Sequence, residues 1–158
     1  MNVRDIMTSP APSIGPTAAV SEVARLILDR GISGLPVVDE RGRVVGLVTK
    51  SDLVAKHAQV HLPRYFGILG TAIPIGTRHA DEELRRILAV TARDLMSDEV
   101  TTTSPDTSVE DAASLMVERD AGPLPVMEGG ALVGLLDEDD IIRLLLLEEE
   151  DEGADTAS

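Results

Sequence analysis

The sequence predicts an α+β fold of two tandem βαββα units related by pseudo-twofold symmetry, each with a small sheet packed on two helices. Motifs in the first half of the 158 residues return 88 or 89 positions later. Apolar residues recur with helical period in each half, and a pair of short apolar runs follows each helix. A tandem repeat of this kind places two like units around a shared cleft.

Four matched segments carry the repeat. They are Arg4-Asp5-Ile6-Met7 with Arg93-Asp94-Leu95-Met96, Pro16 and Val20 with Pro105 and Val109, Leu35-Pro36-Val37 with Leu124-Pro125-Val126, and Gly46-Leu47 with Gly134-Leu135. The offset falls from 89 to 88 within a hairpin turn, where losing one residue costs little. We expect a first unit over 1–56, a connection over 57–91, a second unit over 92–147 and a disordered acidic tail over 148–158.

In the first unit, residues 10–14 are predicted as an extended segment and residues 17–30 as a helix that ends at Gly31. Residues 35–39 and 44–48 are predicted as a hairpin, followed by a helix that begins near Asp52. The predicted apolar face of the first helix consists of Val20, Val23, Ala24, Ile27 and Leu28.

The second unit repeats this order, with an extended segment over 100–103, a helix from Ser104, strands over 124–127 and 132–136, and a last helix over 139–147. The apolar face of its first helix is predicted to be Val109, Ala112, Ala113, Met116 and Val117. The connection holds the only two aromatic residues, Tyr65-Phe66, and a predicted helix from Asp81 to Ala89. Its apolar side chains are expected to cover the cleft, a dimer face or the core of their own chain.

Composition excludes several classes of protein. Without cysteine there is no disulfide or thiol chemistry. The net charge of −14 argues against nucleic-acid binding. Residues 1–79 carry nine Lys or Arg and six Asp or Glu, whereas residues 80–158 carry five and 22, so a small anion should prefer the first repeat. The start lacks an apolar leader and no apolar run is long enough to span a bilayer, so we expect a cytoplasmic protein with no membrane partner.

These motifs, in this order and repeated, resemble a tandem pair of cystathionine β-synthase (CBS) domains, the Bateman module, of the stand-alone prokaryotic type. The resemblance rests on Val3-Arg4-Asp5-Ile6-Met7 and its repeat, on Leu35-Pro36-Val37-Val38-Asp39 and on Gly46-Leu47-Val48-Thr49-Lys50-Ser51-Asp52. It implies an adenosine ligand in the cleft between the units, regulation rather than catalysis, and a flat homodimer. The second function that we consider is a structural interaction module with a vestigial cleft.

The resemblance carries the family's ribose-phosphate motif onto Gly46, Thr49 and Asp52. A carboxylate at Asp52 can accept hydrogen bonds from ribose hydroxyls, while Thr49 and helix N–H groups can meet a phosphate, with Lys50 as its counter-ion. The alternative is that Thr49 and Asp52 only cap the helix. Adenine is expected beside four further residues, whose apolar members also suit an ordinary core. They are Ser13, Ile14, Leu35 and Pro36.

The second repeat departs from the motif, because Asp137 stands where the first repeat has Thr49. Four consecutive acids there would repel a polyphosphate. We therefore expect one nucleotide per chain and a degenerate second site, at Thr102, Leu124, Asp137 and Asp140. The alternatives are that this site takes S-adenosylmethionine, that it holds Mg²⁺ bridging to phosphate, or that the acids only stabilise the last helix through its dipole.

Enzyme activity is not expected, because the sequence contains no nucleophile elbow and no Gly-rich phosphate loop with lysine. His57 and His61 are spaced to clip a metal on a helix, but a third ligand is absent nearby, so a surface pair is expected and no metal or cofactor is assigned. An effector protein would have to be regulated in trans. The sequence does not choose among AMP, ADP, ATP, NAD and S-adenosylmethionine.

Overall fold

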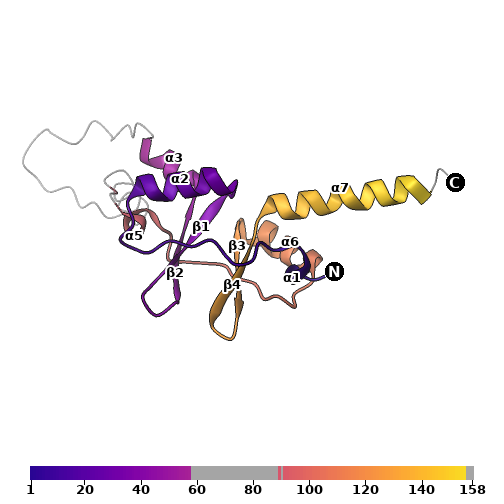
Figure 1. The fold of residues 1–158 in the computed structure, drawn as a ribbon, viewed down its shortest axis with the longest axis horizontal. Coiled ribbons are helices and arrows are strands. Elements are labelled where there is room, and N and C mark those ends of the chain that lie inside the picture. Colours follow the sequence, from indigo (N-terminus) through magenta and orange to yellow (C-terminus); the bar gives the residue numbers. More distant parts are fainter. Residues whose placement is uncertain (58–88, 90, 156–158) are drawn as a thin grey trace, which may run out of the picture.

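The computed structural model describes residues 1–57, 89 and 91–155 (Figure 1). Three predictions fall outside the described residues: the Tyr65-Phe66 segment, the second histidine of the pair at His61, and the helix expected to start at Asp81.

The first repeat contains α1 (Val3–Ile6), α2 (Val20–Arg30), β1 (Gly34–Val38), β2 (Val44–Thr49) and α3 (Lys50–His57). β1 and β2 form an antiparallel hairpin, as predicted. Figure 1 shows α2 and α3 on the same side of this hairpin, away from its turn. β1 is buried at four consecutive positions, so both of its faces are covered, whereas the buried positions of β2 alternate with less buried ones.

The second repeat contains α5 (Ala92–Leu95), α6 (Val109–Arg119), β3 (Leu124–Glu128), β4 (Ala131–Leu136) and α7 (Glu138–Asp155). β3 and β4 form the second antiparallel hairpin, with a register irregularity at the position equivalent to the one in β1 and β2. Figure 1 shows the two hairpins side by side with their turns pointing the same way. This arrangement is the pseudo-twofold pair that the repeat predicts.

The predicted N-terminal strands are reduced to single bridges. Ile14 pairs in parallel with Val37, and Thr103 pairs in parallel with Val126. The Ile14 N–H donates to the Pro36 carbonyl at 3.0 Å. In each repeat a proline follows two residues after the bridge and has no N–H to continue a ladder, so the strand stops there.

The short helices α1 and α5 are exchanged between the repeats. Val3 of α1 is fully buried in the core of the second repeat, and Leu95 of α5 is fully buried in the core of the first. The chain after each helix pairs with the opposite hairpin: the Thr8 N–H donates to the Leu135 carbonyl, and the Ser97 N–H donates to the Leu47 carbonyl, both at 2.9 Å. Each core is thus completed by a helix that the sequence places in the other half.

The two cores are aliphatic. The first contains Val23, Ile27, Ile32, Leu35, Val37, Val48, Ala89, Ala92, Leu95 and Leu135, and the second contains Val3, Ala112, Met116, Leu124, Val126 and Leu136. The predicted apolar faces of α2 and α6 are confirmed at their centres. They are wrong at two equivalent positions, because Leu28 is 75% exposed and Val117 is 83% exposed. Each follows a core residue, Ile27 or Met116, and therefore points about 100° around the helix from it.

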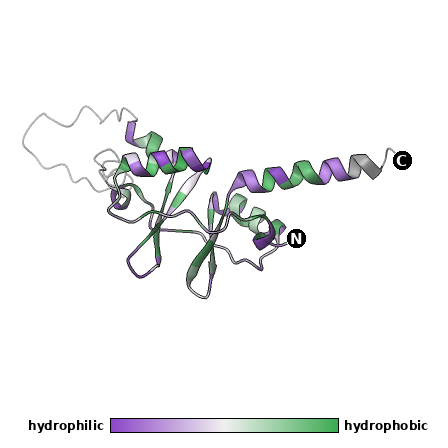
Figure 2. Ribbon diagram, in the orientation of Figure 1, coloured by the Kyte–Doolittle hydropathy of each residue, from purple (hydrophilic) through white to green (hydrophobic). Residues whose placement is uncertain are grey.

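The end of the chain also differs from the prediction. The last helix was expected to end near residue 147 and the tail over 148–158 to be disordered, but α7 continues to Asp155. Leucine and glutamate both favour helix, and no proline interrupts the run. Figure 1 shows α7 extending beyond the body of the molecule, and Figure 2 shows apolar and polar residues alternating along it.

Candidate functional site

The junction between β2 and α3 carries the predicted anchors. Thr49 ends β2, and Asp52 lies in the first turn of α3 with only 7% of its surface exposed. The Asp52 carboxylate accepts hydrogen bonds from the Thr49 N–H at 2.9 Å and from the Thr49 hydroxyl at 3.1 Å. The Lys50 N–H donates to the Ser33 carbonyl at 2.9 Å. Thr49 and Asp52 thus form the helix-start arrangement that the sequence offered as the alternative to a ligand site.

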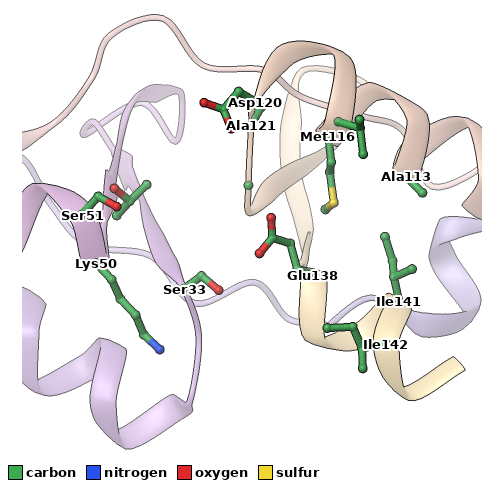
Figure 3. A pocket seen from close by; sticks show the side chains of 13 residues that line it. Ser33, Lys50, Ser51, Ala113, Met116, Asp120, Ala121, Glu138, Ile141 and Ile142 are labelled. Carbon is green, nitrogen blue, oxygen red and sulfur yellow. The ribbon is translucent and has the colours of Figure 1, made fainter. Parts of the chain in front are cut away.

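A cleft of about 830 Å³ lies between this junction and the second repeat (Figure 3). The first-repeat wall consists of Ser33, Thr49, Lys50 and Ser51. The second-repeat wall comes from the end of α6, the following turn and the start of α7. It consists of Ala113, Met116, Val117, Asp120, Ala121, Gly122, Glu138, Ile141 and Ile142. The cleft thus joins a hydroxyl-rich wall with one lysine to a wall of apolar side chains and two carboxylates.

The structure brings only some of the predicted site residues to this cleft. Thr49 and Lys50 line it, and Asp52 lies directly behind Thr49. Leu35 and Pro36 are fully buried, so their side chains belong to the core. The exposed Ser13 and the half-buried Ile14 are not among the residues that line it.

Gly46 lies where the second-repeat chain packs against β2. A Cβ at this position would collide with the Met96 side chain, at 2.7 Å from its Cγ and 2.9 Å from its Cβ. Gly134 packs against Met7 in the same way. Gly46 is also not among the residues that line the cleft described above. The glycine makes room for a methionine that follows the exchanged helix.

The second-repeat residues are engaged in structure. Asp137 is buried, and its carboxylate accepts the Ser33 N–H at 2.7 Å and the Ser33 hydroxyl at 2.6 Å. Asp140 accepts the Asp137 N–H at 2.9 Å, and Arg143 donates to Asp140 at 3.1 Å. Leu124 is buried in the second core, whereas Thr102 is exposed and does not line the cleft.

Burial raises the pKa of Asp140 above its ordinary value, while the hydrogen bond from the Asp137 backbone and the charge of Arg143 act in the opposite direction. The Asp140 carboxyl group therefore loses its proton at a higher pH than an ordinary exposed aspartate does.

Sequence reasoning missed Ser33, Ser51, Asp120 and Glu138. The repeat itself could have found Glu138, because it is the equivalent of Lys50 at the offset of 88. His57 ends α3 and is exposed, and among the residues that the structure describes no group of three or more potential ligands could hold a metal ion.

The family model for the CBS domain matches residues 3–58 and 92–147. The chain belongs to the CBS domain family. Among curated relatives, this CBS pair is 29% identical over 155 residues to the uncharacterized protein MJ1426 of Methanocaldococcus jannaschii, with 92% of each chain covered. It spans only 58% of the length of another relative, the chloroplastic CBSX1 of Arabidopsis thaliana.

Solved CBS-pair structures share this fold. CBSX2 of Arabidopsis thaliana, crystallised in complex with AMP, has a TM-score of 0.74 at 26% identity, with 92% of this chain and 97% of that chain covered. The CBS pair of MJ0100, crystallised with 5′-methylthioadenosine and S-adenosyl-L-methionine, has a TM-score of 0.72 at 23% identity, with 94% and 98% covered. None of the helices in the described part of the chain is long and apolar enough to cross a membrane.

Proposed function

We propose that this CBS pair is a regulatory module that binds one adenosine nucleotide, of the AMP or ATP class, in the cleft between its repeats. The observation that carries the proposal is the β2–α3 junction, which presents Thr49, Lys50 and Ser51 to a cleft of about 830 Å³. The AMP complex of CBSX2, a relative of the same fold, supports an adenosine ligand.

Each wall has a chemical role in this proposal. The Lys50 ammonium and the hydroxyls of Thr49 and Ser51 would hold the phosphate at the start of α3, where the helix dipole favours an anion. The apolar side chains of Met116 and Ile141 offer a surface for the base. Asp52, behind Thr49, would accept a ribose hydroxyl when the Thr49 side chain turns toward the phosphate.

Such a ligand would touch both repeats at once, so its binding energy would favour one relative orientation of the two units. We propose that a partner protein in trans responds to this change in orientation, and that the nucleotide is released unchanged. No cofactor or metal enters the proposal, although Mg²⁺ would accompany a polyphosphate.

A homodimer is the proposed assembly. Four exposed apolar side chains on the helices occupy equivalent positions in the two repeats: Leu28 with Val117, and Val54 with Ile142. A surface that repeats under the pseudo-twofold is suited to a second copy of the same chain. The same surface favours the alternative, a structural interaction module with a vestigial cleft.

Calorimetric titration of the purified chain with AMP, ATP and S-adenosylmethionine tests the proposal. We expect micromolar binding with one site per chain, lost in Asp52→Ala and retained in the matched second-repeat variant Asp140→Ala. Asp52→Asn removes the charge but keeps a hydrogen-bond acceptor beside Thr49, so it is less disruptive to folding than Asp52→Ala. Circular dichroism checks that each variant is folded.

Binding that survives in Asp52→Ala and is lost in Asp140→Ala would move the site to the second repeat. No binding of any ligand by the folded protein would favour the structural module. Two equivalent sites per chain would contradict the asymmetry between Thr49 and Asp137.

A further inference from the structure

The two repeats place opposite charges at equivalent positions in the cleft. Lys50 is the first residue of α3, and Glu138 is the first residue of α7. The two residues are related by the repeat offset, and both line the cleft. Figure 3 shows their side chains coming from opposite walls. The pseudo-twofold therefore relates a cation to a carboxylate, and the cleft has a positive wall and a negative wall.

A second carboxylate lies on the negative wall. Asp120 lines the cleft from the C-terminal cap of α6, where its φ is 49°. The equivalent cap of α2 is Gly31, with a φ of 61°. Glycine adopts this left-handed conformation without steric cost, whereas aspartate does so less readily. The C-terminal end of α6 adds partial negative charge from its carbonyl groups to the same wall.

Lys50 is the only cationic side chain among the residues that line the described cleft. One ammonium and neighbouring hydroxyls suffice for one phosphate group. If the first phosphate of a polyphosphate is anchored at Lys50, each further phosphate would extend into the cleft. The opposite wall of the cleft carries Glu138 and Asp120. At an ionic strength of about 0.01 M the Debye length is about 30 Å, which exceeds the width of a cleft of about 830 Å³, so salt does not screen the repulsion between these carboxylates and the phosphates. A nucleoside offers that wall neutral hydroxyl and amino donors, which carboxylates accept well.

From this arrangement we infer that the cleft selects a nucleoside monophosphate over the di- and triphosphates, with Glu138 and Asp120 as the residues that set this preference. The inference rests on the proposed nucleotide-binding function. It adds the direction in which the ligand lies, with the phosphate at Lys50 and the nucleoside toward the second repeat.

Calorimetric titration of the full chain with AMP, ADP and ATP, in low salt and in EDTA so that no divalent cation shields the phosphates, tests this inference. AMP should bind at least about tenfold more tightly than ATP, the size expected for one like-charge contact in a partly solvated site. Glu138→Gln should reduce this ratio, and adding Asp120→Gly, which copies the first-repeat cap, should reduce it further.

Asp139→Asn is the matched control. It removes the same charge from the neighbouring residue of α7, which is exposed and is not among the residues that line the cleft. It should leave the ratio of AMP to ATP affinity unchanged. Circular dichroism confirms that each variant is folded.

ATP binding as tight as AMP to the unmodified chain would overturn the selectivity. So would an equal effect of Asp139→Asn and Glu138→Gln, which would point to net charge rather than to the cleft wall. Failure of all three nucleotides to bind would instead overturn the proposed function itself, so the two failures are distinguishable.

Discussion

Asp137 illustrates how one residue changes the role of a position that the repeats share. In the first repeat that position is Thr49, which lines the cleft and donates its hydroxyl to Asp52. In the second repeat a carboxylate takes its place and crosses to Ser33, where it accepts two short hydrogen bonds. The sequence predicted the loss of the second site from charge repulsion. The structure adds that the carboxylate joins the two repeats.

Ser33→Ala should lower the free energy of unfolding by about 1–2 kcal/mol, because it removes one hydrogen bond to a buried carboxylate and leaves the backbone bond in place. Urea denaturation measures the difference. Ser114→Ala, which removes an exposed hydroxyl bonded to its own helix, is the control and should change stability by less than about 0.5 kcal/mol. Equal effects of the two variants would show that the contact between the repeats contributes nothing.

Asp140→Asn should change how stability depends on pH. Because the pKa of Asp140 is raised in the folded state, folding holds its proton more tightly than the unfolded chain does. Stability therefore falls as pH rises from the ordinary aspartate pKa through the raised one, and the ionised form is the less stable one at neutral pH. Asparagine removes this loss and keeps an acceptor for the Asp137 N–H.

Thermal denaturation from pH 3 to pH 7 would measure this change, with Asp98→Asn, an exposed carboxylate that does not contribute to the raised pKa of Asp140, as the control. Asp140→Asn should gain stability relative to the parent as pH rises. A difference between variant and parent that shrinks with rising pH would contradict the assignment.

At the scale of the elements, the hairpins and the helices α2 and α6 could be predicted, because alternating and helical apolar patterns are local. The exchange of α1 and α5 could not. Both helices carry nearly the same Arg-Asp-apolar-Met motif, and both cores present similar aliphatic surfaces, so the pattern does not say which core a helix joins. The negative wall of the cleft was missed because Asp120 lies outside the motif, and because Glu138 was considered only as one of the four acids of the second site and not as the counterpart of Lys50.

Gly46→Ala and Gly134→Ala should destabilise the protein to different degrees. A methyl at Gly46 meets the Met96 Cβ at 2.9 Å, close to the backbone, whereas a methyl at Gly134 meets only the more mobile outer atoms of Met7. Chemical denaturation should show a loss of about 1–3 kcal/mol for Gly46→Ala and a smaller loss for Gly134→Ala.

Gly15→Ala is the control for these glycine variants. It has nothing within 4 Å of the added carbon and should be close to neutral. If Gly46→Ala matched Gly15→Ala in stability, the packing of Met96 would not be what requires glycine.

At the scale of the whole molecule, the exposed apolar positions on the helices are the basis of the proposed dimer. The double substitution Leu28→Glu/Val54→Glu should convert the proposed dimer to a monomer, because each change places a charge in the apolar surface that a second copy would cover, and neither residue lines the cleft. Light scattering coupled to size-exclusion chromatography gives the mass.

Ala131→Glu, at the exposed start of β4 by the hairpin turn, is the control for this substitution and should leave the mass of the dimer unchanged (Figure 1). A monomeric parent protein at micromolar concentration would contradict the proposed assembly.

The reciprocal exchange of α1 and α5 has a consequence for how the chain can be divided. A fragment that ends at His57 contains the helix that the other core needs and lacks the one that its own core needs, and the remaining fragment has the opposite deficit. Neither half is therefore an independent folding unit, although each has a complete sequence repeat. When the two halves are produced as separate chains in the same cell, they should assemble into the native structure by complementation. The boundary between the sequence repeats and the boundary between the two cores therefore fall at different places in the chain.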